Sequence, residues 1–221
     1  MGMFRFSMRQ FLVALVLLVV AYPFITDLAH GEVIENSLMM ILLVSAGMAV
    51  GRKSWRLTLV LAVPALASPW LGRRGHEWLP LWAVTGTHMV FTGFVIVQLI
   101  RYVARETRVN AEVLCGGISA YVMLAIFWTP AYLMVSELNP AAFSGAHLAA
   151  HEALNRFDAL YLSFVSLTCV GCNDITPLSR VARMLLMTES LTGVLFLTVL
   201  LARLVALYSQ TSAQPPASED K

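Results

Sequence analysis

Two cysteines, three hydroxyl residues and an aspartate lie close together in one stretch of the chain, SLTCVGCNDITP at positions 166–177. Cys169 and Cys172 form a Cys-x-x-Cys pair there, with Thr168 on one side and Asp174 on the other. Two thiols at this spacing can act as a redox pair or supply half of a zinc site. The Gly, Asn and Asp around them suit irregular backbone, whose carbonyl groups could themselves be the functional atoms.

Distance and missing partners argue against the thiol interpretation. In an extended segment three residues at about 3.3 Å each hold the two Cα atoms about 10 Å apart, whereas a disulfide needs less than about 7 Å. The sequence has no second Cys-x-x-Cys. Its histidines lie in other segments, at His30, His76, His88, His147 and His151. A membrane thiol oxidoreductase or a metal-binding protein that uses Cys169 and Cys172 stays an alternative, as does a role as small apolar filler.

The composition indicates an integral membrane protein. Of 221 residues 58% are hydrophobic and 13% charged, and the mean hydropathy is +0.74, whereas soluble domains average about 45–50% apolar and about 25% charged. The net charge of +2 and the scattered basic residues predict a protein that binds membrane lipid and no nucleic acid. Three cysteines, an odd number, do not make a secreted disulfide framework.

Six apolar runs approach the roughly 20 residues that a helix needs to cross a bilayer. They are Phe11–Thr26, Ser37–Val50, Leu57–Leu71, Leu79–Ile100, Val113–Val135 and Val181–Leu207. The third is short and broken by Pro64 and Pro69. The first follows Arg5 and Arg9 as a secretory signal would, but it exceeds the usual ~7–15 residues and lacks a clear cleavage site. We therefore predict an all-α fold of about six transmembrane helices, the first of them retained.

The basic residues near the ends of these runs fall mostly on one side of the membrane. They are Arg5, Arg9, Arg52, Lys53, Arg56, Arg101, Arg105, Arg108 and Arg203. Because Lys and Arg are enriched in cytoplasmic loops, both termini are predicted to be cytoplasmic, in the plasma (inner) membrane. Arg73 and Arg74 are the exception, since six spans place them outside.

The segment between the last two runs divides into two halves. The first, ELNPAAFSGAHLAAHEALNR, is typical of an exposed outer segment, with turns at Asn139–Pro140 and Ser144–Gly145. The second begins with Phe157–Thr168, apolar over about 18 Å of helix at 1.5 Å per residue, too short to cross the membrane. Such a helix must enter and return, and the backbone after it has to be buried in protein or line a water-filled cavity. Carbonyl groups in that position suit cations.

At these residues the sequence resembles the potassium-channel pore-domain family, which consists of an outer helix, a pore helix, a filter of the type Thr-Thr-Val-Gly-Tyr-Gly-Asp and an inner helix. The resemblance covers about residues 110–208. The filter positions that match are Thr168, Val170, Gly171 and Asp174, and Pro177 fits the turn beyond them. The resemblance implies a homotetramer and a permeant monovalent cation, potassium or sodium, held by the backbone carbonyls of residues 169–172, with no other cofactor and no enzymatic activity.

Three filter positions depart from the family pattern. Cys169 stands where the family has a Thr, and a thiol is a poor substitute for a hydroxyl oxygen with a hard cation. Cys172 replaces a Tyr whose ring, by resemblance, holds the filter's diameter. Asn173 replaces a Gly used where φ is positive, and Asn is among the least costly substitutes there. A weakly selective or non-conducting relative is therefore the alternative within this class.

Two residues of the last run are further candidates. Gly193 lies nineteen residues after Asp174, where the resemblance implies a hinge glycine in the inner helix. Glu189 lies one turn earlier in an apolar helix, where an acid is expected to be functional. It could line the pore or hydrogen-bond back to a pore helix as a buttress. His88 of the fourth run is interpreted as a helix-packing group.

These observations divide the chain into three parts. We expect a membrane bundle of about four helices over residues 1–110, a potassium-channel-like pore domain over residues 111–208 and a disordered cytoplasmic tail over residues 209–221. The fourth run has no Arg or Lys within it, so a voltage sensor is not expected. The short polar tail predicts no cytosolic ligand-binding domain in this chain.

Overall fold

The computed structural model describes residues 7–26, 81–106, 110–145, 153–171 and 174–212. Over these residues the chain forms five α-helices, a short 3₁₀ turn and one pair of short strands. The helices are α1 (Met8–Thr26), α4 (Leu81–Arg105), α5 (Ala111–Leu138), α6 (Arg156–Leu167) and α7 (Arg180–Ser212). The protein is therefore all-α in class. The predicted spans at 37–50 and 57–71 lie outside the described residues.

Three of these helices contain segments that are long and apolar enough to cross a membrane. These segments are Thr85–Arg105 of α4, Ala111–Leu138 of α5 and Arg180–Ser209 of α7. The apolar part of α1, Met8–Phe24, is shorter. Helices α4, α5 and α7 each continue past the predicted apolar runs, because polar and charged residues near a membrane surface can extend a helix without crossing the lipid.

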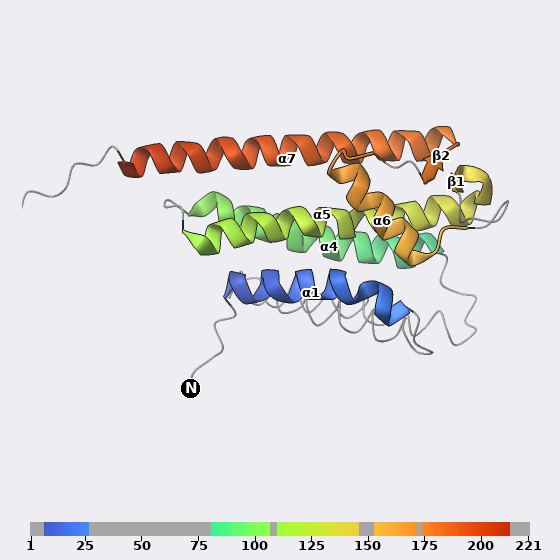
Figure 1. Cartoon of the computed structure of the whole chain (residues 1–221), viewed down its shortest axis with the longest axis horizontal. Coiled ribbons are helices and arrows are strands. Elements are labelled where there is room, and N and C mark those ends of the chain that lie inside the picture. The colour runs from blue at the N-terminus through green and yellow to red at the C-terminus, as the bar shows by residue number, and fades with distance from the viewer. Residues whose placement is uncertain (1–6, 27–80, 107–109, 146–152, 172–173, 213–221) are drawn as a thin grey trace, which may run out of the picture.

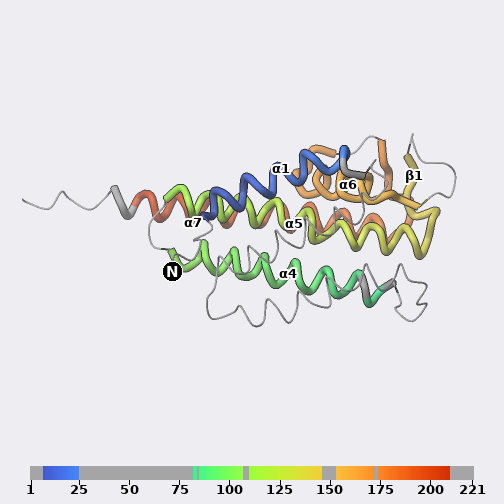
Figure 2. The backbone as a smooth tube through the Cα atoms, turned by 90° about the horizontal axis from the view of Figure 1, so that it is seen from below, coloured from blue at the N-terminus to red at the C-terminus, as the bar shows by residue number. Residues whose placement is uncertain are grey.

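Helix α5 is the centre of the arrangement. It packs against α1, α4, α6 and α7, and Figure 1 shows α7 and α1 on opposite sides of it. The view turned by 90° in Figure 2 shows α4 running beside α5. The side chain of Asn110 begins α5 by accepting a hydrogen bond from the Val113 N–H at 2.9 Å. This cap separates α5 from α4, which ends a few residues earlier.

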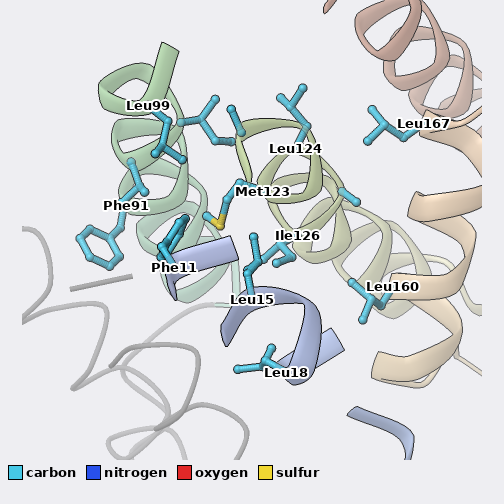
Figure 3. Close-up of a cluster of buried hydrophobic side chains, with 14 of the residues drawn as sticks. Phe11, Leu15, Leu18, Phe91, Leu99, Met123, Leu124, Ile126, Leu160 and Leu167 are labelled. Atoms are coloured by element: carbon cyan, nitrogen blue, oxygen red, sulfur yellow. The ribbon is translucent and has the colours of Figure 1, made fainter. Parts of the chain in front are cut away.

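A core of apolar side chains fills the space between α1, α4 and α5. Its labelled members in Figure 3 come from these three helices and, at the edge, from Leu160 and Leu167 of α6. Gly117 of α5 brings α7 close as well, since a Cβ at that position would lie 3.0 Å from the Leu200 side chain. Small residues allow the backbones of membrane helices to approach closely. Such close packing is needed because the hydrophobic effect does not drive helices together in lipid.

The two ends of the bundle differ in character. At one end Arg203 of α7 donates hydrogen bonds to the carbonyl oxygens of Ala104 and, at 3.1 Å, Glu106. Arg9 of α1 lies 3.5 Å from Glu112 of α5 at the same end. Helices α1, α4 and α7 therefore meet at one end of the bundle. Each of them carries at least one of the Arg residues from which the cytoplasmic termini were predicted.

At the opposite end two short strands replace a predicted turn. After α5, Pro140–Ala142 forms the 3₁₀ turn η1, and β1 (Phe143–Gly145) pairs antiparallel with β2 (Ile175–Pro177). The prediction of a turn at Ser144–Gly145 is wrong, because Ser144 pairs with Thr176 and Gly145 with Ile175. Asn139–Pro140 does form a turn, since the Asn139 side chain accepts a hydrogen bond from the Ala141 N–H at the start of η1.

Candidate pore site

Helix α6 enters the bundle at an angle and stops inside it. The Asn155 side chain caps its start by accepting a hydrogen bond from the Asp158 N–H at 2.8 Å. Its 12 residues span about 18 Å, which is about three-fifths of a bilayer core about 30 Å thick. It runs from the end that carries β1 toward the middle of α7 (Figure 1). Its bounds differ by one residue from the predicted run.

The backbone after α6 turns left-handed twice. Thr168 ends the helix, and its N–H and its hydroxyl both donate to the Phe164 carbonyl oxygen, at 3.0 and 2.8 Å. Cys169 then has φ 56° and Gly171 has φ 90°. Among the described residues Cys169 is the only non-glycine residue with positive φ, a conformation that costs an L-residue about 1–2 kcal/mol. A strained residue of this kind is typical of a functional loop.

The residues of this turn are exposed at the surface of the chain. Thr168, Cys169 and Gly171 are exposed, and Val170 is 80% exposed. The irregular backbone at the depth reached by α6 needs polar partners for its N–H and C=O groups, supplied either by further protein or by an aqueous path. Cys172 and Asn173 lie outside the described residues, so the predicted positive φ at Asn173 stays a prediction.

Side chains from α5 and α7 hold the two carbonyl groups just before the turn. The Tyr121 hydroxyl of α5 donates to the Leu167 carbonyl oxygen at 3.0 Å. The Ser190 hydroxyl of α7 donates to the Ser166 carbonyl oxygen at 2.9 Å. The Cys169 thiol lies 3.9 Å from the Ser190 carbonyl oxygen, within the range of a weak sulfur hydrogen bond. The last turn of α6 is therefore fixed to both long helices.

The chain that leaves the turn is fixed at its outer end. The Tyr161 hydroxyl of α6 donates to Asp174 Oδ1 at 3.2 Å. Beyond β2, the backbone N–H groups of Leu178 and Ser179 both donate to the Ala142 carbonyl oxygen, at 2.8 and 3.2 Å. Asp174 thus lies between α6 and the strand pair, where the Tyr161 hydroxyl holds it against α6.

Glu189 lies behind α6 rather than on the outer surface of α7. Its side chain has no exposed surface. It accepts a hydrogen bond from the Tyr132 hydroxyl of α5, and its Oε1 lies 2.5 Å from the Ser163 hydroxyl of α6. Ser163 also donates to the Ala125 carbonyl oxygen of α5 at 2.7 Å. One carboxyl group therefore joins three helices.

Gly193 lies one turn after Glu189 on the same buried face of α7. An added Cβ would lie 3.1 Å from the Leu167 carbonyl carbon and closer still to its oxygen. The glycine therefore permits the end of α6 to contact the backbone of α7. This contact gives Gly193 a packing role, and the predicted hinge stays a prediction.

The Cys-x-x-Cys pair is described only in part, because Cys172 lies outside the described residues. Cys115 is half-buried in α5 and Cys169 is exposed, and neither is in a disulfide. Over the described part of the chain no three His, Cys, Asp or Glu side chains gather as a metal site would require. His88 lies half-buried in α4. The geometry around Cys169 is that of a backbone turn, with the thiol at its surface.

Four residues of the site carried no signal of their own in the sequence. Tyr121, Tyr132, Ser163 and Ser190 are hydroxyl residues inside apolar helices, where each needs a hydrogen-bond partner. Spacing alone does not give that partner, because Tyr132 and Glu189 are 57 residues apart and Tyr121 and Leu167 are 46 apart. The signal that could have found them is the need of each buried hydroxyl for an acceptor on a neighbouring helix.

One comparison with known proteins bears on the site. Residues 118–210 match the model of a protein family described as an ion channel, and the matched segment runs from α5 through α7. No curated protein and no solved structure matches the chain.

Proposed function

We propose that this protein assembles as a tetramer whose central pore conducts monovalent cations. Residues 118–210 belong to the ion channel family and are its pore domain. The observation that carries this proposal is the end of α6: a helix too short to cross the membrane leads into exposed backbone that is left-handed at Cys169 and Gly171. In the proposed pore the backbone of residues 168–174 lines the ion path.

The left-handed residues explain how a single strand could present several carbonyl groups to an ion. In a regular extended strand successive residues face opposite sides. If every second residue is left-handed, the carbonyl groups that would otherwise face the opposite side are rotated. All the carbonyl groups of the strand then face one side. Cys169 and Gly171 are two residues apart and both left-handed. A row of carbonyl oxygens that replaces the hydration shell of a cation is the basis of conduction in potassium-type filters.

The surface of α7 supports assembly. Only 6% of its apolar window is buried within the chain, compared with 44% for α5. Its exposed side chains include Met187, Leu191 and Val194, in the turns that contain Glu189 and Gly193. One chain supplies one strand of carbonyls, so a closed ring needs several copies, and the family resemblance gives four. We propose that neighbouring copies and the ion path share this surface.

Potassium is proposed to pass more readily than sodium, with weaker discrimination than the family pattern provides. The matching residues Thr168, Val170, Gly171 and Asp174 favour potassium-type carbonyl coordination. Cys169 offers a soft sulfur where a hard hydroxyl oxygen would coordinate better. Both termini are proposed to be cytoplasmic, since the cations Arg9 and Arg203 lie at the end of the bundle opposite the strand pair.

Blockade by a thiol-binding ion tests this proposal. Cadmium binds thiolates strongly, and four copies would bring four Cys169 thiols near the ion path. In liposomes that hold the purified protein, cadmium should block potassium flux. The Cys169→Ser variant should conduct but lose at least part of the block, and Cys115→Ser, on α5, should keep it as the matched control.

Two results would contradict the proposal. Equal block of the parent protein and of the Cys169→Ser, Cys172→Ser double variant would show that these thiols do not face the path. Loss of all flux in a double variant that still assembles as the parent does would favour the thiol alternative, because a hydroxyl replaces the size and polarity of a thiol but not its redox or metal chemistry.

A further inference from the structure

The hydroxyl and carboxyl groups around Glu189 hold too few hydrogens unless Glu189 carries one. Three oxygen-to-oxygen contacts meet there: Tyr132 to Glu189, Ser163 to Glu189 at 2.5 Å, and Ser163 to the Ala125 carbonyl at 2.7 Å. Each contact at this distance needs one hydrogen between its oxygens. Tyr132 and Ser163 supply one each, and a backbone carbonyl supplies none. The third hydrogen has to come from the carboxyl group of Glu189.

The assignment follows contact by contact. Tyr132 donates to Oε2 of Glu189, because the phenol is the donor facing that oxygen. Ser163 donates to the Ala125 carbonyl, which can only accept. Oε1 of Glu189 then donates to the Ser163 oxygen. The Thr129 hydroxyl also lies 3.0 Å from the Ala125 carbonyl oxygen. It adds one contact and supplies one hydrogen, so one hydrogen is still missing.

The surroundings of the carboxyl group agree with a neutral form. Glu189 has no exposed surface and lies in the middle of an apolar helix that is long enough to cross the membrane. An ionised carboxylate buried without a cationic partner is far more costly than a hydrogen-bonded acid. Over the part of the chain that the structure describes, the titratable groups that interact with it are Tyr132 and Tyr121 of α5, and phenols are neutral in neutral solution.

We propose that Glu189 carries its proton in the assembled pore, and that this neutral acid is the positioning residue that sets the height and tilt of α6 and thereby the selectivity of the turn at residues 168–171. The inference rests on the proposed function. Ser163 lies one turn before Ser166 and Leu167, whose carbonyl groups are bonded to α7 and α5. A shift of α6 at Ser163 is therefore passed to the backbone that enters the turn.

A set of variants separates this role from a merely structural one. Glu189→Gln keeps one donor and one acceptor of nearly the same shape, and should leave the potassium-to-sodium permeability ratio close to that of the parent. Glu189→Ala removes both, so the hydrogen bonds from the carboxyl group to Ser163 and from Tyr132 are lost, and should lower the ratio about tenfold. Thr192→Val is the matched control, since the Thr192 hydroxyl bonds only within α7 among the contacts the structure describes.

A spectroscopic readout does not depend on conduction. The infrared spectrum of the purified protein at neutral pH should contain the C=O band of a protonated, hydrogen-bonded carboxyl group, and Glu189→Gln should remove it. If Glu189→Ala does not fold, Tyr132→Phe removes one donor while it leaves the ring packed against Phe143, and should shift the band.

The outcomes are distinguishable from failure of the proposed function. Absence of the band from the parent protein, or a Glu189→Gln variant that loses selectivity as fully as Glu189→Ala, would overturn the inference while ion conduction stands. Absence of any flux from the parent protein would overturn the proposed function, whereas the band would still report the proton.

Discussion

Replacement of Gly193 by alanine tests the contact between α7 and the end of α6. The added methyl group would lie 3.1 Å from both the carbonyl carbon and the Cδ1 atom of Leu167, and closer to the carbonyl oxygen. Overpacking of this kind costs about 1–3 kcal/mol. The upper part of that range applies here, because the obstructing atom is backbone and Tyr121 also holds it in place by a hydrogen bond.

Alanine also favours the helix over glycine by about 1 kcal/mol. The net expectation is a loss of about 2 kcal/mol in the free energy of unfolding, from about 3 lost and about 1 gained. For a chain of this size that corresponds to a fall of roughly 4–8 °C in Tm. Thermal unfolding of the detergent-solubilised protein, followed by intrinsic fluorescence, measures it.

Gly86 of α4 provides the matched control. Outside its own helix turn, a Cβ at that position would meet no atom of the described residues within 4 Å, so Gly86→Ala should leave Tm unchanged or raise it by the helix preference alone. A rise in Tm of Gly193→Ala equal to that of Gly86→Ala would refute the packing argument. An altered open probability without loss of stability would instead support the hinge prediction.

Three further substitutions test the contacts that join the helices. Arg203→Gln should lower the free energy of unfolding by about 1–2 kcal/mol, because the guanidinium group bonds the carbonyl groups that end α4; an unchanged Tm, equal to that of the exposed Arg101→Gln control, would contradict this. Glu112→Ala should cost about 1–2 kcal/mol and speed proteolysis of the start of α1, since the carboxylate accepts from the Met8 N–H at 2.6 Å; equal cleavage rates would count against a cap. Tyr121→Phe removes the hydrogen bond to Leu167 and should lower the free energy of unfolding by about 1 kcal/mol and lower the potassium-to-sodium permeability ratio. A lower Tm with an unchanged permeability ratio would show that this hydrogen bond from α5 does not affect the selectivity of the turn.

The sequence was most informative where the signal is local. The apolar run that predicts α6 begins and ends within one residue of the observed helix, because Asn155 is a strong cap and Thr168 is followed by residues that leave the helical conformation. Helices α5 and α7 were also expected, from apolar length alone, and their charged and polar ends extend further than that measure can show.

Contacts between distant residues were the part that sequence could not supply. The strand pair joins residues 30 to 34 positions apart, and each strand has only three residues, too short for an alternating pattern, so Ser144–Gly145 resembled a turn. An acid inside an apolar helix drew attention to Glu189, but its partners Tyr132 and Ser163 depend on how α5 and α6 pack. The left-handed backbone was expected at Asn173 from resemblance, and no local preference pointed to Cys169.

Cation flux into liposomes that hold the purified protein is the direct test of whether this chain forms an ion path. Potassium uptake driven by a concentration gradient should exceed that of protein-free liposomes and should be faster than sodium uptake under the same gradient, because residues 168–171 present the backbone expected of a carbonyl-lined path. Uptake of both ions at the rate of protein-free liposomes, from protein that retains its thermal unfolding transition, would contradict the assignment of this turn as an ion path.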